Sequence, residues 1–260
     1  MKFQIISDIH LEYYDTLPQL NYFFNVAAPN LILAGDICYY NHPNFMAFFK
    51  IISKLYTTIF FIPGNHDYYS YKEIPEFGFE QVDFIMKENL SSFKNVHFIQ
   101  NDMIEYENTI ILGNTLWFKS NKTINDPRVK LITNPYYIKF GHKFMPSLND
   151  VKNTNKIHYD WLKNTLKNIN TNKHIIVVTH YLPSVKCIHK KYKNNELNDL
   201  YFTNCEELMK YADIWISGHT HDPFTGNING CPIFVNPRGD PNEITNYNKS
   251  LVIETYHSHL

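Results

Sequence analysis

The chain has no excess of charge of either sign: 24 Lys and Arg residues face 25 Asp and Glu residues over 260 positions. Non-specific nucleic-acid binding needs a clustered excess of cations, so we expect none, although a nucleotide or a short oligonucleotide is not excluded as a substrate. Only two of the cations are arginines, Arg128 and Arg238. The four cysteines are scattered without paired spacing, which predicts reduced, buried thiols rather than a disulfide framework.

Long apolar runs are also missing. No run approaches the roughly 20 residues that a membrane-spanning helix needs, and the N-terminal apolar stretch is too short for a secretory signal. We therefore expect a soluble, cytoplasmic protein with no membrane partner. Repeats and Pro/Gly-rich linkers are absent, while 44% of the residues are hydrophobic. This predicts a single domain over residues 1–260, with irregular, cap-like excursions at about 118–155 and 182–198.

Several short apolar runs end abruptly in polar residues: Phe3–Ser7, Leu31–Ala34, Thr58–Ile62, His174–Thr179 and Asp213–Ser217. The runs are nearly continuous rather than alternating, which is typical of central strands covered on both faces. Segments with helical spacing at Leu17–Ala27 and Phe45–Tyr56 separate the first three runs and predict a βαβαβ unit with a largely parallel sheet. Further helices are predicted at Phe77–Leu90, Tyr159–Ile169 and Glu206–Tyr211.

Each of these apolar runs is followed by side chains that commonly bind metals. The seven are Asp8, His10, Asp36, Asn65, His180, His219 and His221. Because the carboxyl ends of neighbouring parallel strands converge, we expect them to share one edge of a sheet. Carboxylate, imidazole and amide ligands favour Mn, Fe or Zn over thiolate-type sites. Seven ligands suit two ions if Asp36 bridges them, and two ions about 3.5–4 Å apart promote in-line displacement at phosphorus.

The ordered set Asp8-x-His10, Gly35-Asp36, Gly64-Asn65-His66-Asp67, Thr179-His180 and Gly218-His219-Thr220-His221 resembles the calcineurin-like metallophosphoesterase superfamily. The resemblance spans residues 8 to 221 and implies an α/β fold, a four-layer α/β/β/α sandwich of two mixed β-sheets flanked by helices. It implies that Asp8, His10 and His221 bind a first metal, that Asp36 bridges, and that Asn65, His180 and His219 bind a second. It further implies that His66 contacts the phosphate and protonates the leaving oxygen.

Some motifs of this sequence differ from those of particular branches of the superfamily, and these differences narrow the class of enzyme that we expect. Phosphoprotein phosphatases of the superfamily carry Gly-Asp-x-x-Asp-Arg-Gly and end the third motif in Glu, whereas here Asn41 stands at the Gly position and Asp67 ends the third motif. The acid that orients the general-acid histidine in those enzymes has no counterpart at the expected position. The Gly-His-Thr-His ending and Asn236-Pro237-Arg238-Gly239 look more like the small phosphodiesterase and phosphohydrolase branch.

For the remaining candidate residues we compare a structural role with a functional one. Asp67 is expected to accept loop backbone N–H bonds. Arg238 either grips a substrate phosphate or forms a structural ion pair, and Arg128 and His142 are weaker substrate-binding candidates. The aromatic residues of the first excursion either stack on a base or pack the loop onto the domain; they are Trp117, Phe118, Tyr136, Tyr137, Phe140 and Phe144.

Together these features predict a dinuclear metal-dependent phosphoesterase in which a metal-bridging hydroxide attacks a phosphodiester or nucleotide-type substrate in line. Its cofactors would be two divalent ions, with Mn preferred over Fe, Zn, Mg, Ni or Co, and its partner a small phosphorylated substrate. Asn65, Asp36 and His66 would take part in catalysis. The alternatives are a phosphomonoesterase such as a nucleotidase, a non-catalytic scaffold resembling the retromer small subunit, and a DNA-repair nuclease subunit. The oligomeric state stays open.

Overall fold

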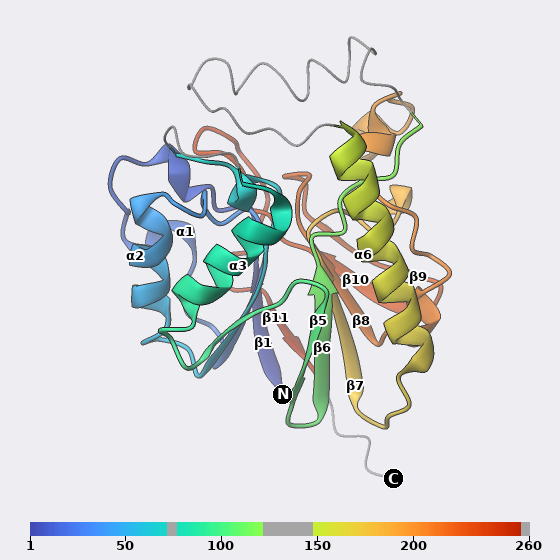
Figure 1. Cartoon of the computed structure of the whole chain (residues 1–260), viewed down its shortest axis with the longest axis horizontal. Coiled ribbons are helices and arrows are strands. Elements are labelled where there is room, and N and C mark those ends of the chain that lie inside the picture. Colours follow the sequence, from blue (N-terminus) through green and yellow to red (C-terminus); the bar gives the residue numbers. More distant parts are fainter. Residues whose placement is uncertain (72–76, 122–147, 256–260) are drawn as a thin grey trace.

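The computed structural model describes residues 1–71, 77–121 and 148–255 (Figure 1). The candidate substrate residues Arg128 and His142 lie outside the described residues, as do Tyr136, Tyr137, Phe140 and Phe144 of the predicted aromatic cap.

The first sheet has five strands in the order β11-β1-β2-β3-β4. Strands β1 (Lys2–Ile6), β2 (Asn30–Ala34), β3 (Thr58–Ile62) and β4 (Val96–Phe98) are parallel, whereas β11 (Val252–Glu254) pairs antiparallel with β1. The predicted parallel β-strand order at the start of the chain is therefore confirmed.

The second sheet has six strands in the order β5-β6-β7-β8-β10-β9. Its strands are β5 (Asp102–Tyr106), β6 (Thr109–Asn114), β7 (His174–Thr179), β8 (Ile214–Ser217), β9 (Phe224–Ile228) and β10 (Cys231–Val235). The inner four are parallel and both edge strands are antiparallel. The expectation that all the candidate metal ligands share the edge of one sheet was wrong. The strands that precede them are divided between the two sheets, with β1, β2 and β3 in the first and β7 and β8 in the second.

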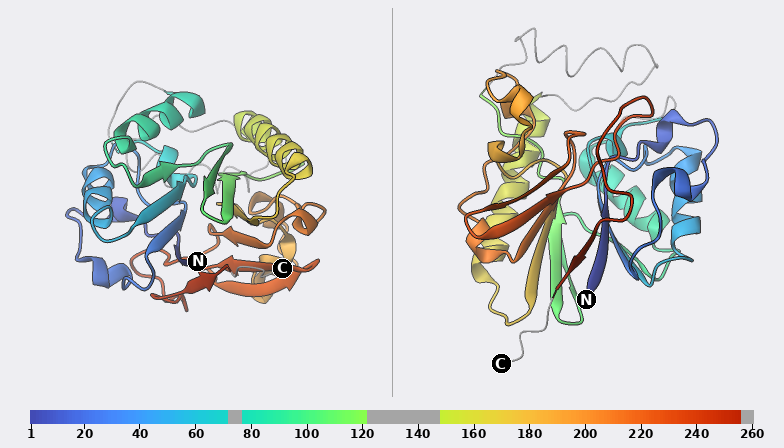
Figure 2. Two further views of the ribbon diagram at one scale, coloured as in Figure 1. Left: turned by 90° about the horizontal axis from the view of Figure 1, so that it is seen from below. Right: turned by 180° about the vertical axis from the view of Figure 1, so that it is seen from behind.

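Helices cover the outer faces of the two sheets. Figures 1 and 2 show α2 (Pro43–Ile52) and α3 (Phe79–Leu90) beside the first sheet and α6 (Leu148–Asn168) beside the second. The chain thus has two mixed β-sheets flanked by helices. Residues 148–155, which the sequence assigns to the first excursion, belong to α6, so this helix begins well before the predicted Tyr159.

Two predicted helices are largely wrong. The segment Leu17–Ala27 forms only the single turn α1 (Leu20–Phe23), because the backbone beyond it bonds elsewhere: Asn25 N–H donates to the Lys249 carbonyl and Ala27 N–H to Gln4 Oε1. The segment Glu206–Tyr211 holds only a short 3₁₀ turn, Met209–Tyr211. In the second excursion, the segment 182–198 contains the short 3₁₀ turns Val185–Cys187 and Lys190–Tyr192.

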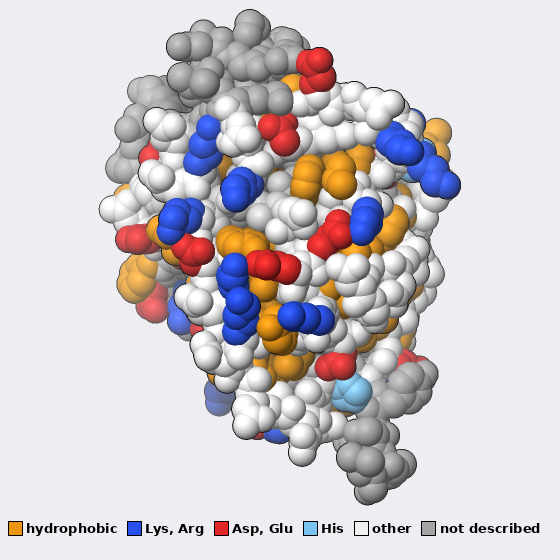
Figure 3. Space-filling model, turned by 90° about the vertical axis from the view of Figure 1, so that its right-hand side faces the viewer, with side chains coloured by type: hydrophobic (Ala, Val, Ile, Leu, Met, Phe, Trp, Pro, Cys, Tyr) orange, Lys and Arg blue, Asp and Glu red, His pale blue; other side chains and the backbone are white. Residues whose placement is uncertain are grey.

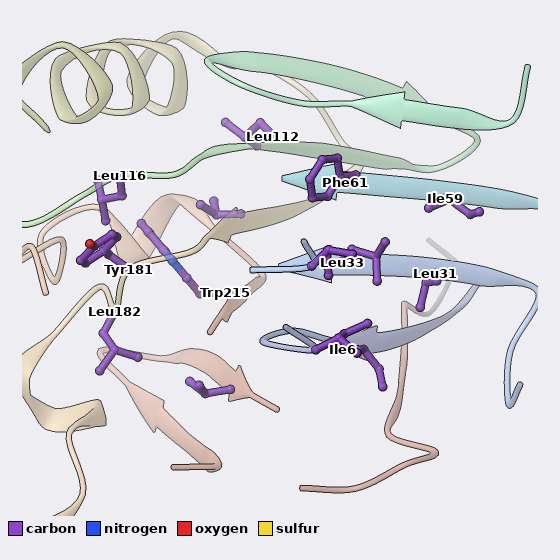
Figure 4. Packing of buried hydrophobic residues seen from close by; sticks show 14 of the residues in the cluster. Ile6, Leu31, Leu33, Ile59, Phe61, Leu112, Leu116, Tyr181, Leu182 and Trp215 are labelled. Carbon is purple, nitrogen blue, oxygen red and sulfur yellow. The ribbon is translucent and has the colours of Figure 1, made fainter. Parts of the chain in front are cut away.

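The core lies on both faces of each sheet, as the continuous apolar runs predict. Between the sheets, alternate residues form one buried cluster that includes Phe3, Ile5, Ile32, Ile62, Ile176 and Ile216. The intervening residues face the helices: Phe61 of β3 packs against Phe49 of α2 with ring centroids 5.2 Å apart. Figure 4 shows this outer packing at Leu33 and Phe61 of the first sheet and at Trp215 of the second. Each such side chain contributes about 1.5–3 kcal/mol by its burial.

All four cysteines are free and buried, as predicted. Within the described residues, no helix is both long and apolar enough to span a bilayer. Figure 3 shows the side that carries α6 and β9, where basic and acidic side chains are interspersed. Two of the pairs there are Lys156 with Asp160 at 2.7 Å and Lys163 with Glu207 at 2.8 Å.

Candidate metal centre

The two sheets point the carboxyl ends of their parallel strands toward the same end of the molecule, the upper end in Figure 1. The predicted ligands follow these strand ends: Asp8 and His10 follow β1, Asp36 follows β2, Asn65 follows β3, His180 follows β7, and His219 and His221 follow β8. The structure therefore brings together all seven residues that the sequence singled out, across two sheets instead of one.

Five of these seven residues have a left-handed backbone. The φ angles are 54° at Asp8, 51° at His10, 55° at Asp36, 77° at His219 and 52° at His221. Non-glycine residues seldom adopt this region, and such strain gathers at functional sites where the surroundings hold it in place. Here the surroundings are hydrogen bonds between the loops: Asp8 N–H donates to the Gly35 carbonyl, and His219 N–H donates to Asp8 Oδ1 at 2.9 Å.

Glycine is required where the loops approach most closely. A Cβ on Gly64 would lie 2.2 Å from Asp36 Oδ1, and one on Gly218 would lie 2.6 Å from Asp8 Oδ2. Both contacts are far inside van der Waals distance. The Gly-Asn and Gly-His steps of the motifs therefore let two carboxylates sit against the neighbouring backbone.

One group of candidate ligand atoms comes from Asp8, His10 and His221, all within 4.8 Å of one another. His10 and His221 each have Nδ1 against a carboxylate oxygen, at 2.9 Å from Glu12 and 2.5 Å from Glu243. A carboxylate that accepts from one ring nitrogen orients the other nitrogen toward a metal. The two Nε2 atoms face each other at 3.0 Å.

The second group comes from Asp36, His180 and His219, again within 4.8 Å of one another. His180 Nδ1 donates to the Ala34 carbonyl at 2.8 Å, and its Nε2 lies 3.1 Å from Asn65 Oδ1 and 3.2 Å from Asp36 Oδ2. The same Oδ2 lies 3.9 Å from His10 Nε2 in the first group. Asp36 thus stands between the two groups, where a bridging ligand has to be.

This donor set fits a pair of cations. With Nδ1–H donating in His10 and His221, two Nε2 lone pairs meet at 3.0 Å, which is unfavourable unless positive charge lies between them. In the second group an imidazole nitrogen, a carboxylate oxygen and an amide oxygen likewise converge. Burial lowers the pKa of His180, but Asp36 outweighs it and raises that pKa to about 9. The centre therefore attracts positive charge, as a proton or as a metal.

His66 lies beside both groups with its orientation fixed. Its Nδ1 is 2.9 Å from Glu12 Oε1, the same oxygen that faces His10 Nδ1, and its ring centroid is 4.5 Å from that of His10. No acid stands at the position that the phosphoprotein phosphatases use, but Glu12 supplies an orienting carboxylate from elsewhere in the sequence. Glu12 comes two residues after His10, and the 3₁₀ turn Leu11–Tyr13 folds it back into the centre. The signal in the sequence was Asp8-x-His10-x-Glu12, with the acid in a different motif from that of the phosphoprotein phosphatases.

Asp67 has the role that the sequence predicted for it. Its buried carboxylate accepts backbone N–H bonds from Asp36, Ile37, Cys38 and Gly64 at 2.7–3.0 Å. These bonds join the loop after β2 to the loop after β3. Asp67 consequently holds two ligand-bearing loops at a fixed distance from each other.

The Arg238 side chain is buried. Its guanidinium lies over the Tyr22 ring at 5.2 Å and donates to the Tyr22 hydroxyl at 3.2 Å and to the Gly239 carbonyl at 2.9 Å. These contacts hold the C-terminal loop against α1, and a role in gripping a phosphate stays a prediction. Trp117 and Phe118 of the expected aromatic cap are buried, and Trp117 packs on Phe79 with centroids 4.9 Å apart. For these two residues the packing alternative is confirmed.

Comparison with known proteins agrees with this geometry. The profile of the calcineurin-like phosphoesterases matches residues 1–223. The chain belongs to this family. Membership in the family supports metal-dependent hydrolysis of phosphoric esters as its activity.

Two individual proteins are similar over nearly their whole length. The chain is 30% identical over 278 residues to uncharacterized protein L509 of Acanthamoeba polyphaga mimivirus, a match that covers 96% of this chain and 95% of L509. The solved structure of the phosphopantetheinyl hydrolase PptH from Mycobacterium tuberculosis matches with a TM-score of 0.70 and 15% identity, over 92% of this chain and 90% of PptH. At that identity the likeness concerns the fold, and it confirms the fold class expected from the motifs.

Proposed function

We propose that residues 1–260 form one catalytic domain, a dinuclear metal-dependent phosphoesterase that hydrolyses a phosphodiester or nucleotide-type substrate. The observation that carries this proposal is the position of Asp36 Oδ2 between two groups of ligand atoms, with His66 beside both. In this assignment Asp8, His10 and His221 would hold one ion, Asn65, His180 and His219 would hold the other, and Asp36 would be shared between them. A bound pair of divalent cations, Mn being our first choice, would stabilise charge on the phosphoryl oxygens and lower the pKa of water.

The chain's own groups contribute orientation and a proton. Glu12 holds His66 by Nδ1, so Nε2 is the ring atom left to face the leaving oxygen of the ester. During hydrolysis the bond from phosphorus to the leaving oxygen breaks, and a bond from phosphorus to a water oxygen forms. The leaving oxygen takes a proton from His66, and the proton that the water loses restores His66. The Asn65 side-chain amide donates to the Tyr69 hydroxyl at 3.2 Å, and we infer that it also helps to hold a phosphoryl oxygen.

The neighbouring histidines support an ionised Asp36. Although burial alone raises the pKa of this carboxyl, His180, His66 and His10 hold it well below its usual range. An ionised carboxylate at this position is the charge that two neighbouring cations require of a shared ligand. A small phosphorylated substrate is the partner that we infer, and a cytoplasmic location stays a prediction.

The test compares hydrolysis of bis-p-nitrophenyl phosphate with that of p-nitrophenyl phosphate. Metal-stripped protein is assayed before and after Mn, Mg, Zn or Ni is restored, and elemental analysis counts the ions bound per chain. We expect two ions, metal-restored turnover of the diester, and loss of both in Asp36→Ala. Asp160→Ala, which removes an exposed carboxylate on α6, serves as the matched control and should retain turnover and metal.

Each other outcome has a defined meaning. Preference for the monoester supports the phosphomonoesterase alternative and redirects the search to nucleotides and sugar phosphates. One bound ion, or turnover that survives Asp36→Ala, contradicts the dinuclear assignment. If two ions bind but neither ester is hydrolysed, the result contradicts the proposed phosphoesterase activity and supports the non-catalytic scaffold alternative.

A further inference from the structure

A pocket of about 200 Å³ lies next to the candidate metal centre. We call it the side pocket; its lining includes Ile188, Tyr192, Leu197, Tyr201, Thr220 and Asp222. Thr220 stands between His219 and His221 in the chain, so the side pocket and the centre share one wall. Tyr201 strengthens that wall, because its ring centroid is 5.4 Å from that of His219. The turns that carry the other lining residues lie at the upper right of Figure 1, at the end of the molecule where β7 and β8 finish.

The side pocket has the size of one ring system. Pockets for whole ligands usually measure about 300–1,000 Å³, whereas this volume corresponds to roughly six or seven water molecules. A whole nucleotide does not fit, but one heterocyclic ring does if the rest of the molecule extends into the metal centre. Ring-sized space beside a phosphoryl site suits a substrate that has its phosphate and its ring a short distance apart.

Its walls favour a planar ring that also makes hydrogen bonds. Tyr192 and Tyr201 supply aromatic faces and Leu197 an aliphatic one. Asp222 adds a carboxylate that can accept from an N–H donor. Lys191 lies 3.3 Å from this carboxylate and over the Tyr192 ring at 4.7 Å, so it balances the charge of Asp222.

We propose that the side pocket binds the nucleobase of the substrate, stacked on tyrosine, while the phosphorus lies at Asp36. This inference rests on the proposed function for the identity of the ester, but base binding itself requires no turnover. It assigns Tyr192 as a specificity-determining residue.

The first experiment measures binding without catalysis. Adenosine, guanosine, cytidine and uridine are titrated onto the metal-restored full chain, with ribose as the ring-free probe. We expect saturable binding of at least one nucleoside, weakened about tenfold in Tyr192→Leu because one stacking face is lost. The matched control is Tyr211→Leu: Tyr211 also ends a 3₁₀ turn and also lies under a lysine, Lys210 at 5.0 Å, but it is not part of the side pocket. No saturable binding, or equal weakening in both variants, overturns the proposal.

The second experiment uses turnover. We expect the ratio of kcat/KM for the preferred nucleoside monophosphate to that for ribose 5-phosphate to fall about tenfold in Tyr192→Leu and to keep its value in Tyr211→Leu. A ratio near one in the unaltered protein contradicts the side-pocket inference while leaving the phosphoesterase intact. Conversely, saturable, Tyr192-dependent nucleoside binding without hydrolysis of any ester supports the side pocket and contradicts the proposed function.

Discussion

Glu12 offers the sharpest test of how the centre works. Its carboxylate is almost completely buried, and its Oε1 lies 2.9 Å from Nδ1 of both His66 and His10. Burial raises the pKa of Glu12, but His10 and His66 outweigh that effect and lower it, so the carboxylate is ionised at neutral pH. Glu12→Gln keeps the shape of the side chain and removes the charge. The amide also permits the opposite orientation, in which its NH₂ group faces the imidazole and favours the wrong tautomer.

The size of the effect follows from the two contacts. Removing an outer carboxylate partner of a metal-binding or catalytic histidine costs about 10- to 100-fold, whereas general acid catalysis as a whole is worth about 10²–10⁴-fold. If Glu12 acts through His66, the loss depends on how much the leaving oxygen needs a proton. We expect kcat/KM to fall about 10- to 100-fold for a p-methylphenyl ester and less than about threefold for the p-nitrophenyl ester, whose phenolate leaves unprotonated.

The assay is a series of ring-substituted phenyl esters of the type that the enzyme hydrolyses, with metal content measured on each variant. His66→Asn should show the same dependence on the leaving group, and the double variant should be no worse than His66→Asn alone, because the two residues act as a unit. Glu88→Gln on the exposed face of α3 is the control. An equal loss for all esters together with lost metal would refute the reasoning, since Glu12 would then act only through His10.

Three further predictions concern stability. Burial lowers the pKa of His158 to about 3, so the unfolded chain takes up a proton near pH 6.5 while the folded chain does not. This residue alone should therefore cost about 2 kcal/mol of stability between pH 7 and pH 5, and the change in urea-unfolding free energy over that range should differ by this amount in His158→Gln and be unaltered in the partly exposed His174→Gln. Asp67→Asn places an amide against four backbone N–H donors and should cost about 2–4 kcal/mol in urea unfolding, whereas a cost below about 1 kcal/mol would contradict its role as a loop clamp. A Cβ on Gly113 would lie 1.8 Å from the Val178 carbonyl oxygen, so Gly113→Ala should lower Tm by more than about 5 °C, and an unchanged Tm would show that β6 and β7 separate readily.

The strand ends and the ligands could be predicted because both depend on short, local patterns. A continuous apolar run followed by Asp or His marks a buried strand that ends at a site, and Asp8, Asp36 and His180 all follow that rule. The division of these strands between two sheets has no local signature. It depends on β11 returning to pair with β1 and on β6 pairing with β7, contacts between segments far apart in the chain.

The errors in the helices have specific physical causes. The segment after Phe23 has helical spacing, but the Gln4 side chain and the Lys249 carbonyl bond its backbone, and these tertiary contacts replace the helical ones. The first turns of α6 are polar and rich in Asn, so their periodicity is weak. Asn155 is buried there nonetheless, because its amide donates to the Leu116 carbonyl and to Thr203 Oγ1. A buried side chain satisfied by distant partners looks like a surface residue in the sequence.

The carboxylates around the centre combine the orientation of its histidines with a demand for positive charge. Asp8, Glu12 and Asp36 are almost completely buried, and Glu243 contacts His221 at 2.5 Å, which places four carboxylates around one small site. Burying several anions without compensating charge is strongly unfavourable. Protonated histidines supply part of the compensating charge, since the pKa values of His180 and His221 are both raised to about 9. A divalent cation supplies the same compensation when it displaces those protons. The acids that orient His66, His10 and His221 therefore have a second consequence: they give the centre the negative charge that attracts metal ions, so that the orientation of the histidines and the affinity for cations depend on the same residues.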